Sequence, residues 1–327
     1  PLNNKQLLKP KKEEKVGACE SVRKREKHRR EENDGKRERR KRNGPPFVAD
    51  ISVLPEGCIS DIVSLSLTTP KDACRVCAVS PIFRAAAESN AVWERFLPSD
   101  YQAIIARSSS SSDSLNLCSK KKIYLSLSDN PILIDDSKKS FFLDKSSGKK
   151  CYLLAARELC IIWSGSPQFW NWISLPEESR FPEVAELLKV CWLDIFGKMS
   201  TSMLSPNTNY AAYLVYKLTE EAYGFDHLPP TVSLGTTEGG EVCRQTVFLY
   251  QPAVEPNQQD QIVPPQQPQH TSHPSQRKDG WLEIKLGEYF NEEGNDYELQ
   301  IRLLEGESHQ WKSGLIVEGM EIRPTKG

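Results

Sequence analysis

The sequence predicts an α+β multidomain protein, in which a disordered basic tail precedes a small helical domain and then an all-β sandwich. Three observations predict this order. Apolar residues recur at helical spacing after Pro55. From about residue 121 onward, short apolar runs alternate with Gly, Pro, Asn and Asp, which is typical of a sandwich. Basic residues are concentrated before residue 44.

The tail, residues 1–46, is set apart by its charge. Residues 1–44 hold 17 Lys and Arg against 8 Asp and Glu, so the rest of the chain holds 26 against 36, and the net charge of −1 hides this asymmetry. The runs RKREKHRR (23–30) and KRERRKR (36–42) fit a solvated segment, a nuclear-import signal or a nucleic-acid-binding arm. Because the tail has no aromatic residue to stack on a base, nucleic acid is disfavoured as a partner.

The helical domain is predicted over residues 47–106. Pro55 suits the first turn of a helix. The apolar stripe of that helix is formed by Leu54, Cys58, Ile59, Ile62, Val63 and Leu67. Two further helix starts are marked by a cap residue followed by proline, at Thr69 with Pro70 and at Ser80 with Pro81. The run NAVWERFL (90–97) adds a last short turn.

A Ser-rich linker, residues 107–120, is predicted to lead into the sandwich over residues 121–325. The run KKIYLSLSDNPILI (121–134) alternates apolar and polar residues, as a strand does. The clearest strand is YELQIRLLE (297–305), in which the apolar residues Tyr297, Leu299, Ile301 and Leu303 occupy alternate positions. The Pro- and Gln-rich segment 252–277 cannot form a central strand and is predicted to be a long mobile loop.

The residue types that carry chemistry form no catalytic pattern. Cys74 and Cys77 make a CxxC, but no second pair accompanies them, so buried thiols are favoured over zinc. The nine cysteines are odd in number and lie in apolar runs, which predicts reduced core thiols in an intracellular protein. No P-loop, dinucleotide fingerprint or GxSxG element occurs. We therefore predict a non-catalytic protein that needs no cofactor, and no apolar run is long enough to predict a membrane span.

Three of the seven tryptophans, Trp163, Trp170 and Trp172, gather around the turn at residues 164–168. Such a cluster is either part of a core or a platform for a flat apolar ligand face. Trp170 follows a proline-containing turn and is expected to be exposed, whereas Trp163 ends an apolar run and fits both interpretations equally. Trp172 is assigned mainly to packing, as are three tryptophans outside the cluster: Trp192, Trp281 and Trp311.

Two parts of the sequence resemble known families. LPEGCISDIVSLSLTTPKDACRVCAVSPIF and AVWERFL resemble an F-box, with its opening Leu-Pro-Glu and closing Trp. Residues 121–325 resemble the plant phloem-protein-two domain, the jelly-roll-like fold of the tobacco jasmonate-induced lectin. The shared blocks are CYLLAARELCIIW, QFWNW, FPEVAELLKVCWLDIFGK, LSPNTNYAAYLVYKL, DGWLEIKLGEYFN and WKSGLIVEGMEIRP. This order of domains is that of plant F-box proteins of the lectin-like class.

The resemblance implies a division of labour between the two domains. An F-box docks the S-phase-kinase-associated adaptor of an SCF-type cullin–RING ubiquitin ligase. The positions that match its interface are Leu54, Pro55, Ile59, Ile62, Val63 and Trp93. The sugar site proposed for the tobacco lectin falls on Trp163, Trp170, Glu298 and Glu305. Indole faces and carboxylates suit a glycan that contains N-acetylglucosamine.

The expected function is therefore substrate recognition in a ubiquitin ligase of the nucleus and cytoplasm. Its expected partners are the adaptor and a glycan or glycoprotein target, with no membrane partner. Three alternatives stay open. The apolar F-box residues only hold the helices together, the protein is a stress-response lectin that acts without a ligase, or it is a ligase receptor for targets that carry no glycan.

Overall fold

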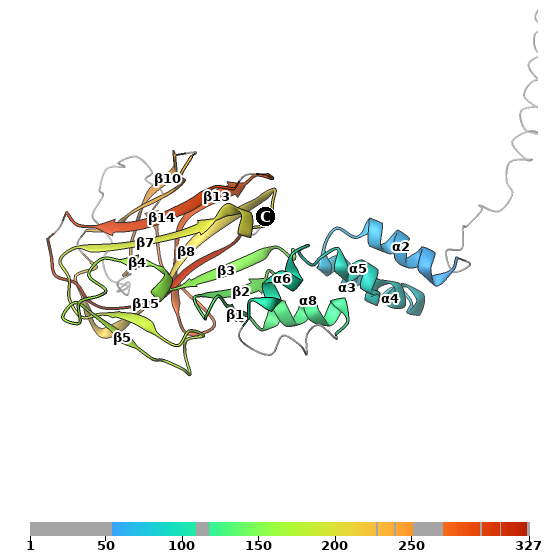
Figure 1. Cartoon of the computed structure of the whole chain (residues 1–327), viewed down its shortest axis with the longest axis horizontal. Coiled ribbons are helices and arrows are strands. Elements are labelled where there is room, and N and C mark those ends of the chain that lie inside the picture. Colours follow the sequence, from blue (N-terminus) through green and yellow to red (C-terminus); the bar gives the residue numbers. More distant parts are fainter. Residues whose placement is uncertain are drawn as a thin grey trace, which may run out of the picture. The chain divides into compact units, whose positions relative to one another are not determined.

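The computed structural model describes residues 54–108, 118–226, 228–238, 240–250, 271–294, 296–307 and 309–325. The basic tail and most of the Pro- and Gln-rich loop lie outside these ranges, so both remain predictions. Within the described ranges, helices come first and a large antiparallel β region follows, which confirms the predicted fold class (Figure 1). The helices are α2 (Glu56–Ser66), α3 (Pro70–Val76), α4 (Pro81–Glu88), α5 (Asn90–Glu94), α6 (Tyr101–Ala106) and α8 (Lys120–Asp129).

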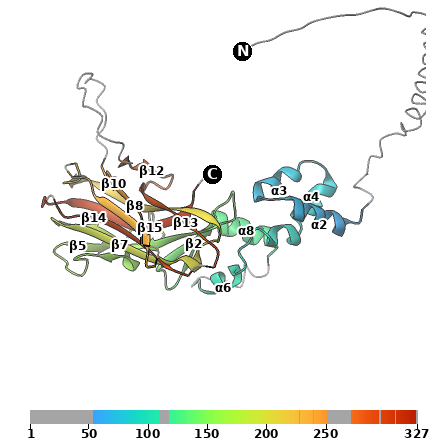
Figure 2. The same cartoon turned by 90° about the horizontal axis from the view of Figure 1, so that it is seen from above.

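Capping residues define two of the short helices as predicted. The Thr69 side chain accepts a hydrogen bond from the backbone N–H of Asp72 at the start of α3. Ser80 accepts one from Phe83 N–H at the start of α4. Each cap satisfies a backbone donor that has no partner inside the helix. Helices α2, α3 and α4 lie side by side in the helical domain (Figure 2).

The segment after the linker differs from its prediction. Residues 120–129 form helix α8 rather than a strand. Ile123, Tyr124 and Leu127 are all buried, because this spacing places them on one helical face. The Tyr124 ring contacts that of Trp93 in α5, with ring centroids 5.2 Å apart. Its hydroxyl donates to the Asp144 carbonyl at 3.1 Å. Helix α8 therefore contacts both the helical domain and the sandwich.

The strands form two layers that stack face to face, and all their pairs are antiparallel except the short pair of β10 with β11 (Figure 1). In the described residues, one sheet has nine strands and the other has six. The nine-stranded sheet follows the order β1 (Ile132–Ile134), β2 (Lys139–Leu143), β3 (Lys150–Ala155), β15 (Ser313–Pro324), β8 (Thr208–Tyr223), β13 (Leu282–Asn291) and β12 (Ser275–Gln276), with β5 (Trp170–Ile173) and β6 (Val184–Leu187) as a branch from β15. The six-stranded sheet follows β11 (Thr271–Ser272), β10 (Gly240–Val247), β9 (Thr231–Thr236), β14 (Glu298–Glu305), β7 (Leu193–Ser200) and β4 (Cys160–Ile161).

The core lies between the sheets and follows the period-two pattern of the strands. Leu299, Ile301 and Leu303 of β14 are fully buried, as the alternation in 297–305 predicts. The sheets approach closely where Gly197 of β7 faces Met320 of β15, since a Cβ there would lie 2.7 Å from the Met320 sulfur. The inner faces are therefore filled, and any ligand surface must lie outside this core.

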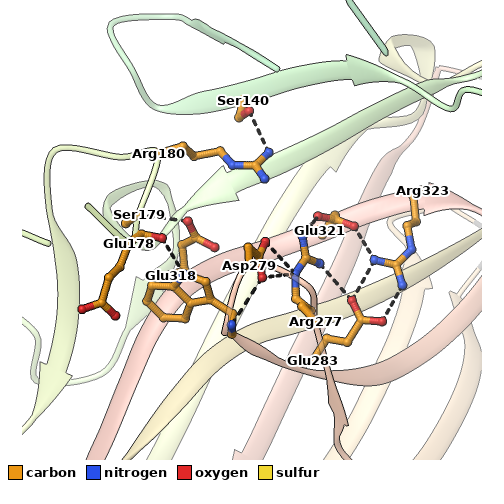
Figure 3. Close-up of polar contacts among 11 residues, drawn as sticks. Ser140, Glu178, Ser179, Arg180, Arg277, Asp279, Glu283, Glu318, Glu321 and Arg323 are labelled. Carbon is orange, nitrogen blue, oxygen red and sulfur yellow. Dashed lines mark hydrogen bonds and ion pairs between the residues drawn. The ribbon is translucent and has the colours of Figure 1, made fainter. Parts of the chain in front are cut away.

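The outer face of the nine-stranded sheet is partly covered as well. Phe181 and Trp281 pack there in a second apolar cluster, and the Trp281 indole N–H donates to the Glu178 carbonyl at 2.8 Å. A chain of ion pairs continues from this cluster (Figure 3). Its members are Arg277, with partners Asp279, Glu283 and Glu321, and Arg323, with partners Glu283 and Glu321. We call this set the charged network.

Glu318 of β15 is a separate buried carboxylate on the same face (Figure 3). One of its oxygens accepts a hydrogen bond from the Ser179 hydroxyl at 3.0 Å, and the other has no hydrogen-bond partner among the described residues. Burial raises the pKa of Glu318 above its ordinary 4.5, although the charge of Arg180 and the Ser179 bond oppose the rise. The folded state therefore favours the protonated acid.

This raised pKa predicts a measurable dependence of stability on pH. The stability that protonated Glu318 contributes is fully present below pH 4.5 and is lost as the pH rises through its folded-state pKa. Glu318→Gln keeps a neutral side chain at every pH. We expect the unfolding free energy of the wild type, relative to that of Glu318→Gln, to fall as the pH increases, as measured by urea unfolding. Parallel pH profiles for the two proteins would contradict this assignment.

Candidate interaction surfaces

Helix α2 carries two apolar faces. Ile59, Val63 and Leu67 form the inner face and are buried against the other helices. The second face contains Cys58, Ile62 and Leu65, all exposed, and Leu54 is exposed before the helix begins. The spacing of four and then three residues places the three helical side chains in one row, which we call the apolar stripe. Ile62 is 42% and Leu65 77% exposed, so a large part of the stripe is open to solvent among the described residues.

The tryptophan cluster divides between the interior and the surface. Trp163 is 56% exposed and has a positive φ of 66°, an uncommon conformation for a residue with a side chain. Trp170 is 2% exposed, so the expectation that it is exposed is wrong. Its indole N–H donates to the Ile162 carbonyl at 3.1 Å, and that of Trp172 donates to the Ser164 carbonyl at 3.2 Å. The two inner indoles thus hold the backbone on either side of Trp163.

A cleft of about 670 Å³ lies on the outer face of the six-stranded sheet. We call it the outer cleft. Strands β7, β14 and β9 form its floor, because outward-pointing residues of neighbouring strands meet there. Its lining includes the side chains of Asp194, Phe196, Ser233, Gln300 and Arg302. Ile162 lines one side, and its backbone N–H donates to the Asp194 carbonyl, so the loop bearing Trp163 begins at the rim.

The floor of the outer cleft is polar and fixed by hydrogen bonds. Arg302 donates through two nitrogens to the carboxylate of Asp194, at 2.9 and 2.6 Å. The hydrogen bond to Asp194 raises the pKa of Arg302 and holds its planar group in one orientation. Glu298 lies on the same outward row and pairs with Lys198 at 3.1 Å. A hydrogen bond from Gln300 and this lysine lower the pKa of Glu298, so it is ionised at neutral pH.

Glu305 points the other way. It stands seven positions after Glu298 on β14, and an odd separation places two residues on opposite faces of a strand. Its side chain is buried and forms an ion pair with Lys312, which is buried as well. Glu305 therefore supports the end of the sandwich from within. Its carboxylate does not share a surface with that of Glu298.

The thiols are more accessible than expected. Cys58, Cys74 and Cys160 are exposed, whereas Cys151 is buried. The expectation that the cysteines are core thiols is thus wrong for these three, because each lies on the outward side of its element. Among the described residues, no group of three or more His, Cys, Asp or Glu could hold a metal ion. No helix in this part of the chain is long and apolar enough to cross a membrane.

Comparison with known proteins decides the family. The family described as phloem protein 2 matches residues 149–324. Two Arabidopsis thaliana relatives align over both domains. An F-box protein is 44% identical over 281 residues, covering 86% of this chain and 82% of the relative. Putative F-box protein PP2-B12 is 46% identical over 272 residues, covering 83% and 96%. The chain belongs to the F-box proteins with a phloem protein 2 domain.

Among solved structures, a xylan-binding domain from Paenibacillus barcinonensis aligns with 52% of this chain and 94% of its own length. Its TM-score is 0.22 and its sequence identity is 14%, which is too weak a likeness for any argument.

The six predicted adaptor-binding positions of this F-box divide by burial. Leu54, Pro55 and Ile62 are exposed, and the other three are buried: Ile59, Val63 and Trp93. The Trp93 indole N–H donates to the Ala87 carbonyl at 2.7 Å, so this residue supports the helices from inside. Leu65 was missed, although its position three residues after Ile62 places it on the same helical face. Whether the exposed three bind an adaptor remains a prediction.

The four predicted sugar-binding positions of the phloem protein 2 domain do not form one surface. Trp163 is exposed and follows the cleft residue Ile162 in the chain, and the partly exposed Glu298 lies two positions before the cleft residue Gln300 on β14. Neither of them lines the outer cleft itself, and Trp170 and Glu305 are buried. Of the tryptophans assigned to packing, Trp281 is fully buried, but Trp192 and Trp311 are each 51% exposed. The assignment is wrong for these two, because both lie just before a strand begins, where the backbone leaves the sheet.

Proposed function

We propose that this chain is the non-catalytic substrate-recognition subunit of an SCF-type cullin–RING ubiquitin ligase. The apolar stripe is the surface for the S-phase-kinase-associated adaptor. The exposure of the stripe supports this role, because a row of exposed apolar side chains on one helix usually marks a surface that a partner protein covers. Tethering then raises the concentration of the target near the ubiquitin-charged enzyme, so the chain itself needs no catalytic group. We place this activity in the nucleus and cytoplasm.

We further propose that the outer cleft binds a glycan that contains N-acetylglucosamine. The cleft offers the groups that sugars use. Phe196 in the cleft and Trp163, which follows the lining residue Ile162 in the chain, provide aromatic faces for the C–H side of a sugar ring. Ser233, Gln300 and Arg302 provide hydrogen-bonding groups for hydroxyl and amide groups. The observation that carries this proposal is the fixed Arg302–Asp194 pair on the cleft floor.

Glycan binding by the full chain tests this part of the proposal. We expect Trp163→Ala and Gln300→Ala each to weaken binding to an immobilised N-glycan panel by about tenfold, because each removes one ring contact or hydrogen bond. An array presents many copies of the glycan, so that weak single-site binding gives a signal.

Phe290→Ala provides the matched control, since Phe290 is an exposed aromatic residue on β13 of the other sheet. It is expected to bind the panel like the wild type. Equal binding by all four proteins would remove the outer cleft as the sugar site. Loss of binding in every variant, the control included, would point to unfolding, which a melting curve checks.

A second candidate function is a ligase receptor for targets that carry no glycan. The burial of Trp170 and Glu305 favours it, because half of the residues that match the lectin site cannot touch a ligand. Absence of any glycan signal from the folded wild type would select this alternative. If the protein is instead a stress-response lectin that acts without a ligase, it must bind the glycan and must not bind the adaptor.

A further inference from the structure

Five exposed large side chains gather at one end of the sandwich, where β14 ends and β7 begins (left in Figure 1). They are Trp192, Tyr223, Leu228, Tyr250 and Trp311, and we call them the aromatic end. Strand register places them there. Leu193 opposes Glu305, Thr231 opposes Leu304, and Thr246 opposes Thr231 in the six-stranded sheet. Ser313 opposes Tyr223 in the other sheet, and a bridge between Val190 and Lys312 joins the two ends.

The backbone holds these side chains at fixed positions. The Trp192 indole lies against Gly306, because a Cβ on that glycine would stand only 3.2–3.3 Å from three ring atoms. Gly224 has a φ of 85°, and a Cβ there would overlap the Trp311 carbonyl, so the two segments are in direct contact. Glycine at both positions allows this close approach. The aromatic end is thus a surface whose neighbouring segments are held in direct contact.

Two hollows lie beside each other on this surface. One, of about 250 Å³, is lined by Trp192, Leu228 and Glu307. The other, of about 270 Å³, is lined by Tyr223, Tyr250 and Glu220. Phe225 and Asp226 line the second hollow, and Leu228 and Pro229 line the first, so residues close together in the chain contribute to both. Each hollow has the size to accept one side chain, which suits an extended peptide better than a flat protein face.

The charge of this surface indicates what it binds. Glu220 and Glu307 are exposed and form no ion pair with any described residue, and Lys312, the cation inside this end, is already paired with Glu305. A neutral sugar would leave the two carboxylates without a countercharge. A guanidinium or ammonium group would gain from both a carboxylate and an indole face.

We propose that the aromatic end binds an extended protein segment in which Arg or Lys alternates with apolar residues. The cationic side chains lie over Trp192 and Trp311 near the carboxylates, and apolar side chains fill the hollows. This surface shares no lining residue with the outer cleft. The inference therefore goes beyond the proposed function, and either one can fail without the other.

Fluorescence anisotropy of the full chain with a labelled (Arg-Leu)₄ peptide tests the proposal. We expect saturable binding that Trp192→Ala, Trp311→Ala and Glu307→Gln each weaken by about tenfold. Phe290→Ala and Glu288→Gln, which change an exposed aromatic residue and an exposed carboxylate on β13, are expected to leave it unchanged. Melting curves confirm that each variant is folded.

Three competitors sharpen the result. We expect none of the three competitors to displace the probe: a (Glu-Leu)₄ peptide, an N-acetylglucosamine trimer, and a peptide of residues 23–42 of this chain. The last of these is cationic and has no apolar side chain. Equal displacement by the 23–42 peptide would reduce the interaction to charge alone and overturn the proposal. Displacement by the sugar trimer, or equal binding by the Trp192 variant, would overturn it as well.

Discussion

Ile62→Asp combined with Leu65→Asp is expected to abolish binding of the S-phase-kinase-associated adaptor and to leave the fold intact. Both side chains lie in the apolar stripe and are exposed, so their loss costs the isolated chain little. In a complex they would be buried against the adaptor, where a central apolar residue is worth about 2 kcal/mol or more. An unpaired carboxylate in the same place adds a desolvation cost of comparable size. Together these terms predict a loss of affinity of at least about 100-fold.

The control for this experiment changes charge without touching the stripe. Gln102→Asp adds a carboxylate on the exposed side of α6 and is expected to bind the adaptor like the wild type. Titration calorimetry with the purified adaptor measures all three proteins. Wild-type affinity in the doubly substituted chain, with unchanged melting, would show that α2 does not dock the adaptor. Reduced melting temperature would instead assign the stripe to the fold.

Arg277→Ala is expected to have the largest effect on stability of any single substitution in the charged network. Arg277 is mostly buried and pairs with Asp279, Glu283 and Glu321 (Figure 3). Its removal leaves Glu283 and Glu321 with Arg323 as their remaining partner in the network, and leaves Asp279 with no partner there. Breaking a buried ion pair from one side costs about 3–5 kcal/mol. For a domain of this size, that lowers the melting temperature by roughly 10 °C.

Acid provides a second measure of the same network. Burial opposes the ionisation of Glu283, but the hydrogen bonds and charges of Arg323 and Arg277 outweigh it and lower its pKa. The stability from this carboxylate is present above pH 4.5 and is lost as the pH falls through its folded-state pKa. The advantage of the wild type over Arg277→Ala should therefore shrink on acidification.

Lys285→Ala is the matched control, because Lys285 forms an exposed pair with Glu288 on the same strand as Glu283. Exposed pairs contribute about 0–1 kcal/mol, so this variant should melt close to the wild type. A melting temperature for Arg277→Ala as high as that of the control would mean that the network adds nothing to the fold.

The elements with strong local patterns could be predicted from the sequence. Thr69 and Ser80 cap their helices because a cap depends only on residues within one turn. The strand at 297–305 follows from strict alternation. The same alternation places Glu298 and Glu305 on opposite faces of the strand, because they are seven positions apart and seven is odd. The sequence alone therefore already indicated that both carboxylates cannot belong to one sugar site.

Other features depend on contacts that lie far away in the chain. Residues 123–127 satisfy both the two-residue and the helical period, and the contact of Tyr124 with Trp93 favours the helix. Trp170 is buried because β6 and the loop at Ile162 cover it. The outer cleft joins Asp194 to a partner 108 residues later, and no local pattern marks such a pair.

The central claim is that one chain joins a glycoprotein to a ligase adaptor, and a three-component capture assay measures it directly. The adaptor is immobilised, and a labelled N-glycosylated protein is added with or without the full chain. We expect the glycoprotein to be retained only when the chain is present, and to be lost with Ile62→Asp/Leu65→Asp, with Trp163→Ala, or after enzymatic removal of the glycan. Adaptor-bound chain that retains the glycosylated and the deglycosylated protein equally, or that retains neither, would contradict the claim.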